Sequence, residues 1–348
     1  MEKKSKETVY EIAILGRATW NLHSLSNEGT VGNVTEPRTI ILADGTQTDG
    51  VSGEILKHMH AEYMWALENN KDNFCEVCKK FRPERADGNP KVRKKSNAED
   101  AVKEAIECEL CDVHGFLVQR PPATRESTIE FGWAVGIPYV QRSIHVHSRH
   151  ALHEAYLEID EEREEGKWEK EKCSVRECKT EESESKLYKV KNRWYCETHL
   201  PVRTPQMLYH RPTRSGAYGV VSVFQPWRIG LNNVNFIYDI NDDDKRKFRY
   251  KLALKAYQAM FMRPEGAMTS TRLPHTENFE GVIVVSKTNF PVPVISPLKD
   301  DYKEQINSIK ATIDSGNSID IIKFDSISNF VEKMDGLLDK GPYKVEFE

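Results

Sequence analysis

The chain has 348 residues and a net charge of −4, with 39% apolar and 30% charged residues. This length allows one large or two ordinary domains. No run approaches the ~18 consecutive apolar residues of a membrane span, and the polar start Met1–Lys6 has no signal-peptide pattern, so we expect a cytoplasmic protein without a membrane partner. Residues 151–190 hold 13 acidic and 8 basic residues, which leaves about +1 for the rest. The charge therefore neither supports nor excludes a nucleic-acid partner.

The first ordered segments are a strand and a helix. Val9–His23 alternates at period two, as a strand does. Ser52 is the expected N-cap of the helix, with Glu54 in its first turn. Four apolar residues at four-residue spacing predict its buried face: Ile55, Met59, Tyr63 and Leu67.

Residues 70–204 have a different composition, with all seven cysteines and few long apolar runs. We interpret them as inserted finger and thumb material stabilised by metal. The acidic run Glu158–Glu165 is expected to form a helix, and Ser127–Val140 is a candidate segment that returns to the core.

The last third of the chain alternates again between strand and helix patterns. Tyr218–Phe224, Phe236–Ile240 and Gly281–Val285 have strand patterns, and a helix is expected from Asp242 to a stop at Gly266. Two helical stretches are expected near the C-terminus, at Ile306–Ile313 and Ile321–Leu338.

Without the insertion, this order fits the βαββαβ plan. The sequence therefore predicts an α+β fold: a ferredoxin-like, RNA-recognition-motif-like palm with large zinc-bearing insertions. The palm is assigned to residues 8–69 and 205–300, the insertion to 70–204 and a helical C-terminal segment to 301–348. The aromatic signature of classical RNA-recognition motifs is absent, so base stacking on a central strand is not expected.

The cysteines form two groups with metal-ligand spacing. Two CxxC pairs separated by 29 residues supply the first group: Cys75, Cys78, Cys108 and Cys111. The second group is less standard in spacing: Cys173, Cys178, Cys196 and His199. Four thiolates, or three with one histidine, close a tetrahedral zinc site without an open position, so we expect two structural zinc ions.

One alternative is a zinc-dependent enzyme. His60-Ala61-Glu62 followed by the Cys75–Cys78 pair resembles the HxE…PCxxC signature of zinc deaminases. Phe74 stands in place of the proline, and Cys108 and Cys111 would have no role. We therefore interpret His60 as an ordinary helix residue and find no P-loop, HExxH or GxSxG motif.

Several segments together resemble a known family. They are GRATWNLHSLSNEGTVGN (Gly16–Asn33), VSGEILKHMHAEYM (Val51–Met64), CDVHGFL (Cys111–Leu117) and GAMTSTRLPH (Gly266–His275). Their order and spacing resemble the DevR-type backbone subunit of the CRISPR Cascade complex, in the RAMP superfamily. The cysteine-rich insertion and the acidic region match less clearly.

The resemblance implies a CRISPR RNA-binding scaffold without catalytic residues. Such subunits stack head to tail along the guide RNA, contact other Cascade subunits and present the guide for pairing with a target DNA strand. Carried over by position, the implied RNA-binding residues are Arg17, Asn21, His23, Asn33, Ser52, Lys57, His58, Arg214, Ser270, Thr271 and Arg272. These side chains suit phosphate and 2′-hydroxyl contacts.

RNA-cutting relatives in the superfamily place an aspartate in the loop after the first strand. Residues 11–43 contain no aspartate before Ala43, and their carboxylates are Glu11, Glu28 and Glu36. This absence favours a scaffold. Cleavage of target RNA, with Glu28 as the replacing acid, stays open as the alternative function.

Overall fold

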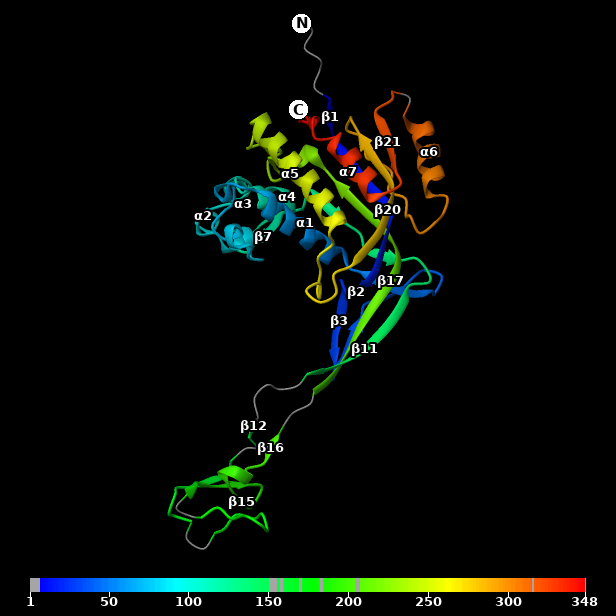
Figure 1. The fold of residues 1–348 in the computed structure, drawn as a ribbon. Helices are drawn as coiled ribbons and strands as arrows, with labels where there is room; N and C mark the ends of the chain where they lie inside the picture. Colours follow the sequence, from blue (N-terminus) through cyan, green and yellow to red (C-terminus); the bar gives the residue numbers. More distant parts are fainter. Residues whose placement is uncertain are drawn as a thin grey trace. The chain divides into compact units, whose positions relative to one another are not determined.

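The computed structural model describes residues 7–149, 155–156, 159–168, 171–181, 184–203, 207–314 and 316–347. The chain forms two compact units (Figure 1). The larger contains the segments up to residue 29, 35–143 and 212 onward, and the smaller contains residues 30–34 and 144–211. Residues 70–143, which the sequence analysis assigned to the insertion, belong to the larger unit.

A large antiparallel sheet organises the larger unit. Its strand order is β21-β20-β2-β17-β10-β6-β5, and β9 also pairs with β17. The bounds are β2 Glu11–His23, β5 Thr39–Ile41, β6 Gln47–Val51, β9 Ile129–Phe131, β10 Ala134–Gly136, β17 Met207–Phe224, β20 His275–Ser286 and β21 Ile319–Phe324. Central β2 has partners on both sides, with Ile14 opposite Ser222 of β17 and Ile283 of β20.

Helices cover both faces of this sheet (Figure 1). Helices α1 (Gly53–Leu67), α5 (Asp243–Met262) and α7 (Ile327–Asp335) share a core with Ile12 and Ile14 of β2. Helix α6 (Tyr302–Ile313) packs on the opposite face with Ala13 and Leu15. Both faces of β2 are buried, so the side chains that alternate along the predicted first strand pack into two different cores.

Shorter elements complete the larger unit. They are β1 Thr8–Val9, β3 Asn27–Val31, β4 Val34–Pro37, α2 Pro90–Arg93, α3 Ala98–Ile106, α4 Glu109–His114, β7 Phe116–Val118, β8 Ala123–Arg125, β11 Gln141–Arg149, β18 Leu231–Asn232, β19 Ile237–Tyr238 and β22 Gly341–Pro342, with β3, β4 and β11 crossing into the smaller unit. The α+β class predicted from the sequence is confirmed. No helix in the described ranges is long and apolar enough to span a membrane.

The smaller unit is built around a three-stranded sheet. Its strands are β13 Glu161–Arg163, β14 Leu187–Val190 and β15 Arg193–Cys196, and β12 (Ala155–Tyr156) pairs with β16 (Val202–Arg203). The helix predicted for the acidic run is wrong, because β13 pairs with β14 instead. Lys189 and Lys186 neutralise Glu161 and Glu162 across the strands. Glu158 lies outside the described residues.

The strand predicted at Phe236–Ile240 is not part of the main sheet. Within Phe236–Ile240 only β19 is a strand, and it pairs with β18 outside the main sheet. The side chains of Asn232 and Asn235 accept backbone hydrogen bonds two residues ahead, which folds this segment into tight turns. Strands β9 and β10, from the segment Ser127–Val140, occupy the place beside β17.

Helix α1 begins where the sequence predicts, but its buried face is rotated. Ser52 accepts a hydrogen bond from the Ile55 backbone N–H at 3.4 Å, which confirms the N-cap. The buried residues are Leu56, Met59, His60, Ala61 and Met64, whereas Leu67 is 40% exposed. His60 faces the core although it is polar, because its ring nitrogens have hydrogen-bond partners there. A pattern of apolar residues alone therefore does not include it.

The C-terminal segment contains a strand that the sequence analysis missed. Residues Ile319–Phe324 form β21 at the sheet edge beside β20, and the helix expected from Ile321 begins only at Ile327. The β-branched Ile319, Ile321 and Ile322 favour a strand locally. Ser326 then caps α7 by accepting from the Asn329 N–H.

Candidate metal centres and nucleic-acid interface

The first cysteine group converges as predicted. All four sulfur atoms of Cys75, Cys78, Cys108 and Cys111 lie within 4.8 Å of one another, and the Cys78 and Cys111 sulfurs are 3.6 Å apart. No disulfide joins them, since all four are free cysteines. Tetrahedral Zn–S bonds of ~2.3 Å separate sulfurs by about 3.8 Å, so the donor set fits a closed metal site.

Local backbone turns aim these thiols at one point. The Cys75 carbonyl accepts from the Lys79 N–H at 2.9 Å, and Phe81 adopts a left-handed conformation at φ 50°. Cys108 stands at the N-cap of α4, which places Cys111 on its first turn. Hydrogen bonds from the neighbouring thiols, Cys108 first, lower the pKa of Cys75. Hydrogen bonds with the same neighbours, Cys108 first, raise the pKa of Cys78 and of Cys111, so the protons are shared unevenly among the four thiols.

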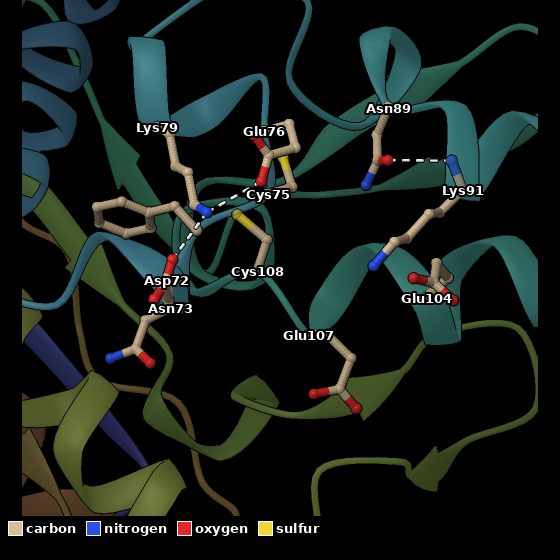
Figure 2. A pocket seen from close by; sticks show the side chains of 11 residues that line it. Asp72, Asn73, Cys75, Glu76, Lys79, Asn89, Lys91, Glu104, Glu107 and Cys108 are labelled. Carbon is tan, nitrogen blue, oxygen red and sulfur yellow. Dashed lines mark hydrogen bonds and ion pairs between the residues drawn. The ribbon is translucent and has the colours of Figure 1, made fainter.

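The rim of this group is polar. Cys75 and Cys108 line a hollow of about 260 Å³ (Figure 2). Beside it, Lys79 donates to Asp72 at 2.8 Å and to Glu76 at 2.9 Å. These exposed pairs close the loop around the first CxxC pair and leave its thiols facing inward.

A buried ion network anchors the second CxxC pair to the core. Asp112 directly follows Cys111 and has no exposed surface. It accepts from Arg125 at 2.5 Å and Arg249 at 2.7 Å, and its two oxygens also accept from the Gly230 N–H. The network links the cysteine module to α5 and to the β17–α5 connection. The sequence analysis missed it, because no local pattern pairs residues so distant in the chain.

The second cysteine group lies in the smaller unit. The donor atoms of Cys173, Cys178, Cys196 and His199 also lie within 4.8 Å of one another, with Cys196 Sγ 3.1 Å from His199 Nδ1. Burial opposes ionisation of Cys178, but hydrogen bonds from Thr180 outweigh it and lower its pKa to about 6. The predicted ligand atoms therefore converge in both groups, and each group could hold a metal ion.

His60 contacts Ala253 and His114, and it is not part of the cysteine group. Its Nε2 bonds the Ala253 carbonyl and its Nδ1 lies 3.0 Å from His114 Nε2. The carbonyl only accepts, so His60 Nε2 carries the proton and His114 Nε2 donates to His60 Nδ1. Burial lowers the pKa of His60 to about 3, so the pair is neutral. The deaminase-like arrangement of His60 with Cys75 and Cys78 is therefore not formed.

The start of α1 gathers three of the predicted RNA-binding residues. Ser52 is buried as the N-cap, Lys57 is half-buried and His58 is exposed. Lys57 lines two hollows, of about 650 and 680 Å³, and His58 lines the first of these together with a third of about 550 Å³. Burial and the nearby Arg85 charge lower the pKa of Lys57.

The segment after α5 borders the same helix. Gly266 and Thr269 line the third hollow with His58. Ser270 and Thr271 are exposed, whereas Arg272 is only 8% exposed and donates to the Thr271 hydroxyl at 3.2 Å. The structure therefore brings this loop to the α1 region, with two of its three predicted residues on the surface.

The predicted residues on β2 and its partner strand occupy a separate place. Arg17 pairs with Asp300 at 2.8 Å and Asn21 donates to Glu277 at 2.8 Å. His23 and Arg214 have no exposed side-chain surface.

An internal network holds these two buried residues. His23 Nε2 contacts the Tyr218 hydroxyl at 2.9 Å, Tyr218 donates to Asp49 at 3.1 Å, and Arg214 lies 3.4 Å from the same carboxylate. Burial, with the Arg214 charge, lowers the pKa of His23 to about 3. His23 and Arg214 thus lie inside the strand end, not on its surface.

The predicted residue Asn33 lies in the smaller unit. It donates a hydrogen bond to the Leu208 carbonyl at 3.0 Å.

Comparison with known proteins settles the family. The family described as CRISPR-associated negative auto-regulator DevR/Csa2 matches residues 14–191 and 197–307. The chain belongs to this DevR/Csa2 family. CRISPR-associated protein Cas7/Cst2/DevR of Methanocaldococcus jannaschii is 22% identical over 352 residues, covering 93% of this chain and 99% of that protein.

A solved chain from a CRISPR RNA-guided surveillance complex, pre-nicking, is also similar. It is 10% identical at a TM-score of 0.48, over 95% of this chain and 99% of that one. A likeness at this level supports no conclusion about function. The family resemblance stated from the sequence motifs is confirmed by the family match alone.

Proposed function

We propose that this DevR/Csa2-family chain is a non-catalytic backbone subunit that binds CRISPR RNA and oligomerises along it in a Cascade-type complex. Its partners are the guide RNA, further copies of the chain, other Cascade subunits and a target DNA strand that pairs with the guide. The observation that carries the proposal is a set of cations without carboxylate partners around the start of α1. Contacts to phosphate from such residues need no sequence reading.

The charges at α1 are available for this purpose. Within the described residues, the side chains of Lys57 and Arg82 form no hydrogen bond or ion pair, and both line the hollow of about 650 Å³. The Glu130 carboxylate acts on Lys57 only through its charge, without an ion pair. A lysine without an ion pair on a partly buried surface adds little to the stability of the fold and can bind phosphate. The helix N-terminus adds its positive dipole end at the same place.

The sheet order supports a ferredoxin-like palm. Taking β2, β9, β17 and β20 as the four palm strands, their order in the sheet is fourth, first, third, second, all antiparallel. Helices α1 and α5 fill the two helix positions of the βαββαβ plan on one face. In this scheme the first cysteine module is the insertion between α1 and the second palm strand.

We assign zinc to both cysteine groups and the cytoplasm as the location. Thiolate and imidazole donors in closed four-ligand sets suit zinc, which would have a structural role. Reduced free cysteines fit a reducing compartment. Metal analysis of the purified chain should find two zinc ions per protein.

Native purification tests the proposal directly. We expect a high-mass assembly that carries RNAs of uniform length protected from nuclease. A monomer that stays free of RNA after addition of a CRISPR transcript would refute it.

A matched pair of lysine variants tests the site. Lys57→Ala should lower the slope of log affinity against log salt by ~0.7, the contribution of one phosphate contact to a single strand. Lys255→Ala, at an exposed position of α5, should leave the slope unchanged. Equal slopes for both variants would remove Lys57 from the interface.

Target-RNA cleavage is the competing function. Its candidate acid, Glu28, is 51% exposed and pairs with Arg38 at 3.1 Å. A scaffold subunit predicts that the assembled complex leaves target RNA intact. Cleavage that disappears in Glu28→Gln while guide binding persists would establish the nuclease instead.

A further inference from the structure

Two buried carboxylates meet where helix α1 ends and helix α4 begins. Glu68 is the C-cap of α1 and is 3% exposed, and Glu109 is the first residue of α4 and is 5% exposed. In each side chain the Oε2 atom is buried without a hydrogen-bond partner. Buried charged groups are normally paired with an opposite charge or bound to a metal ion, so these two carboxylates indicate an additional cation.

The two side chains act on each other directly. Burial, opposed by the charge of Arg249 and reinforced by the charge of Glu68 and a hydrogen bond with it, raises the pKa of Glu109 to about 8. A hydrogen bond between two carboxyl groups requires their oxygen atoms to lie close together. Two carboxylates at such a distance can ligate the same metal ion.

The nearby cations of the protein form other contacts. Arg249 donates to Asp112 at 2.7 Å and to backbone carbonyls at the end of α3. Lys71 donates to backbone carbonyls at the end of α1. Within the described part of the chain, no cation forms an ion pair with Glu68 or Glu109, so the place between their carboxylates is left for a cation from solution.

Glu109 also faces space that can hold water. It lines a hollow of about 500 Å³. The walls of this hollow contain three further carboxylates and two cations: Asp72, Glu107, Asp244, Lys245 and Arg249. An ion bound by Glu68 and Glu109 can therefore keep several water ligands, as Mg²⁺ does in sites with one or two carboxylates.

We propose that Glu68 and Glu109 bind a hydrated divalent cation of the Mg²⁺ type. One oxygen of each carboxylate ligates the ion, and waters in the hollow complete its octahedral shell. The ion neutralises both carboxylates and joins the end of α1 to the first cysteine module. Oxygen ligands favour Mg²⁺ or Mn²⁺ over zinc, so the site differs in metal from the two cysteine groups. It does not depend on the proposed guide-RNA function.

Manganese is the probe that tests the site. Free Mn²⁺ gives an electron paramagnetic resonance signal that is lost when the ion binds to the protein. The full chain, loaded with zinc and freed of nucleic acid, is titrated with Mn²⁺. Thiolates select zinc, so the cysteine groups keep their metal. We expect one Mn²⁺ bound per chain, displaced by Mg²⁺, and a higher melting temperature in the presence of either ion.

Two glutamine variants and a control locate the ion. Glu68→Gln and Glu109→Gln each remove one carboxylate ligand at nearly constant volume. Each should weaken Mn²⁺ binding about 10-fold or more at unchanged zinc content, since even the loss of an outer partner of a metal ligand has an effect of that size. Glu84→Gln, at an exposed position of the same module that does not line this hollow, should bind Mn²⁺ as the unmodified chain does. Undiminished Mn²⁺ binding by either of the first two variants, or no bound Mn²⁺ in the unmodified chain, would overturn the site and mean that the two carboxyl groups share only a proton.

Discussion

The buried Asp112 network gives the sharpest test of how the cysteine module is attached. In Asp112→Asn the carboxylate is lost while Arg125 and Arg249 stay buried, each only 3% exposed. The asparagine amide keeps one acceptor oxygen. Its NH2 group would face the N–H donors that hydrogen-bond to the second carboxylate oxygen of Asp112. Removing one partner from a buried ion pair costs about 3–5 kcal/mol. We expect a loss of this size in the free energy of unfolding.

Urea unfolding at pH 7 with zinc present measures the effect. Asp300→Asn is the matched control, because Asp300 is 97% exposed and also pairs with an arginine. An exposed pair contributes about 0–1 kcal/mol. If the two substitutions destabilise the protein equally, the network is not the anchor of the module, and the reasoning from burial fails.

Three further predictions concern metal, pH and packing. Chelation of zinc should change the fluorescence of Trp168 and Trp194, which pack against the second cysteine group, and a chain lacking both tryptophans should lose this signal. Burial lowers the folded-state pKa of His23 and His60 to about 3 and that of His114 well below its usual value. The unfolded chain therefore binds more protons below about pH 6.5, and stability should fall from there toward pH 3 by up to ~1.4 kcal/mol per pH unit for each histidine. His23→Gln should reduce that slope in urea titrations, and the exposed His58→Gln should not. Gly53→Ala should cost about 1–3 kcal/mol, because its Cβ would lie 2.4 Å from the Phe131 carbonyl oxygen, whereas Gly336→Ala meets nothing closer than 3.4 Å.

The sequence predicted features that depend on local chemistry. Both cysteine groups follow from ligand spacing, and the α1 and α5 starts follow from Ser52 and Asp242, whose side chains cap the first turns. Prediction from the sequence failed where contacts with distant segments determine the local structure. The strand pattern of Phe236–Ile240 is interrupted by asparagine turns, and the short β9 and β10 carried too little pattern to outrank it.

The candidate site was predictable in part for the same reason. Lys57 and His58 stand in a recognisable helix start, so the family resemblance reached them. Arg82 and Arg85 stand in a polar loop that gives no sign of which helix it will face. Only the closure of the cysteine group around Cys78 and Cys111 brings that loop to α1.

The first cysteine group and the hollow of about 650 Å³ at the start of α1 are therefore linked by short stretches of chain. Arg82 lies four residues after Cys78, and His114 lies three residues after Cys111, so the same two knuckles that converge on one point also set both walls of the hollow. The Arg85 bonds to the His114 and Gly115 carbonyls join these walls directly. The separation of charge follows as well: the acids of residues 151–190 lie in the smaller unit, while the unpaired cations gather at α1 in the larger one. A chain with a net charge of −4 can thus present a local surface for RNA, because the position of its charges, and not their sum, decides what the surface attracts.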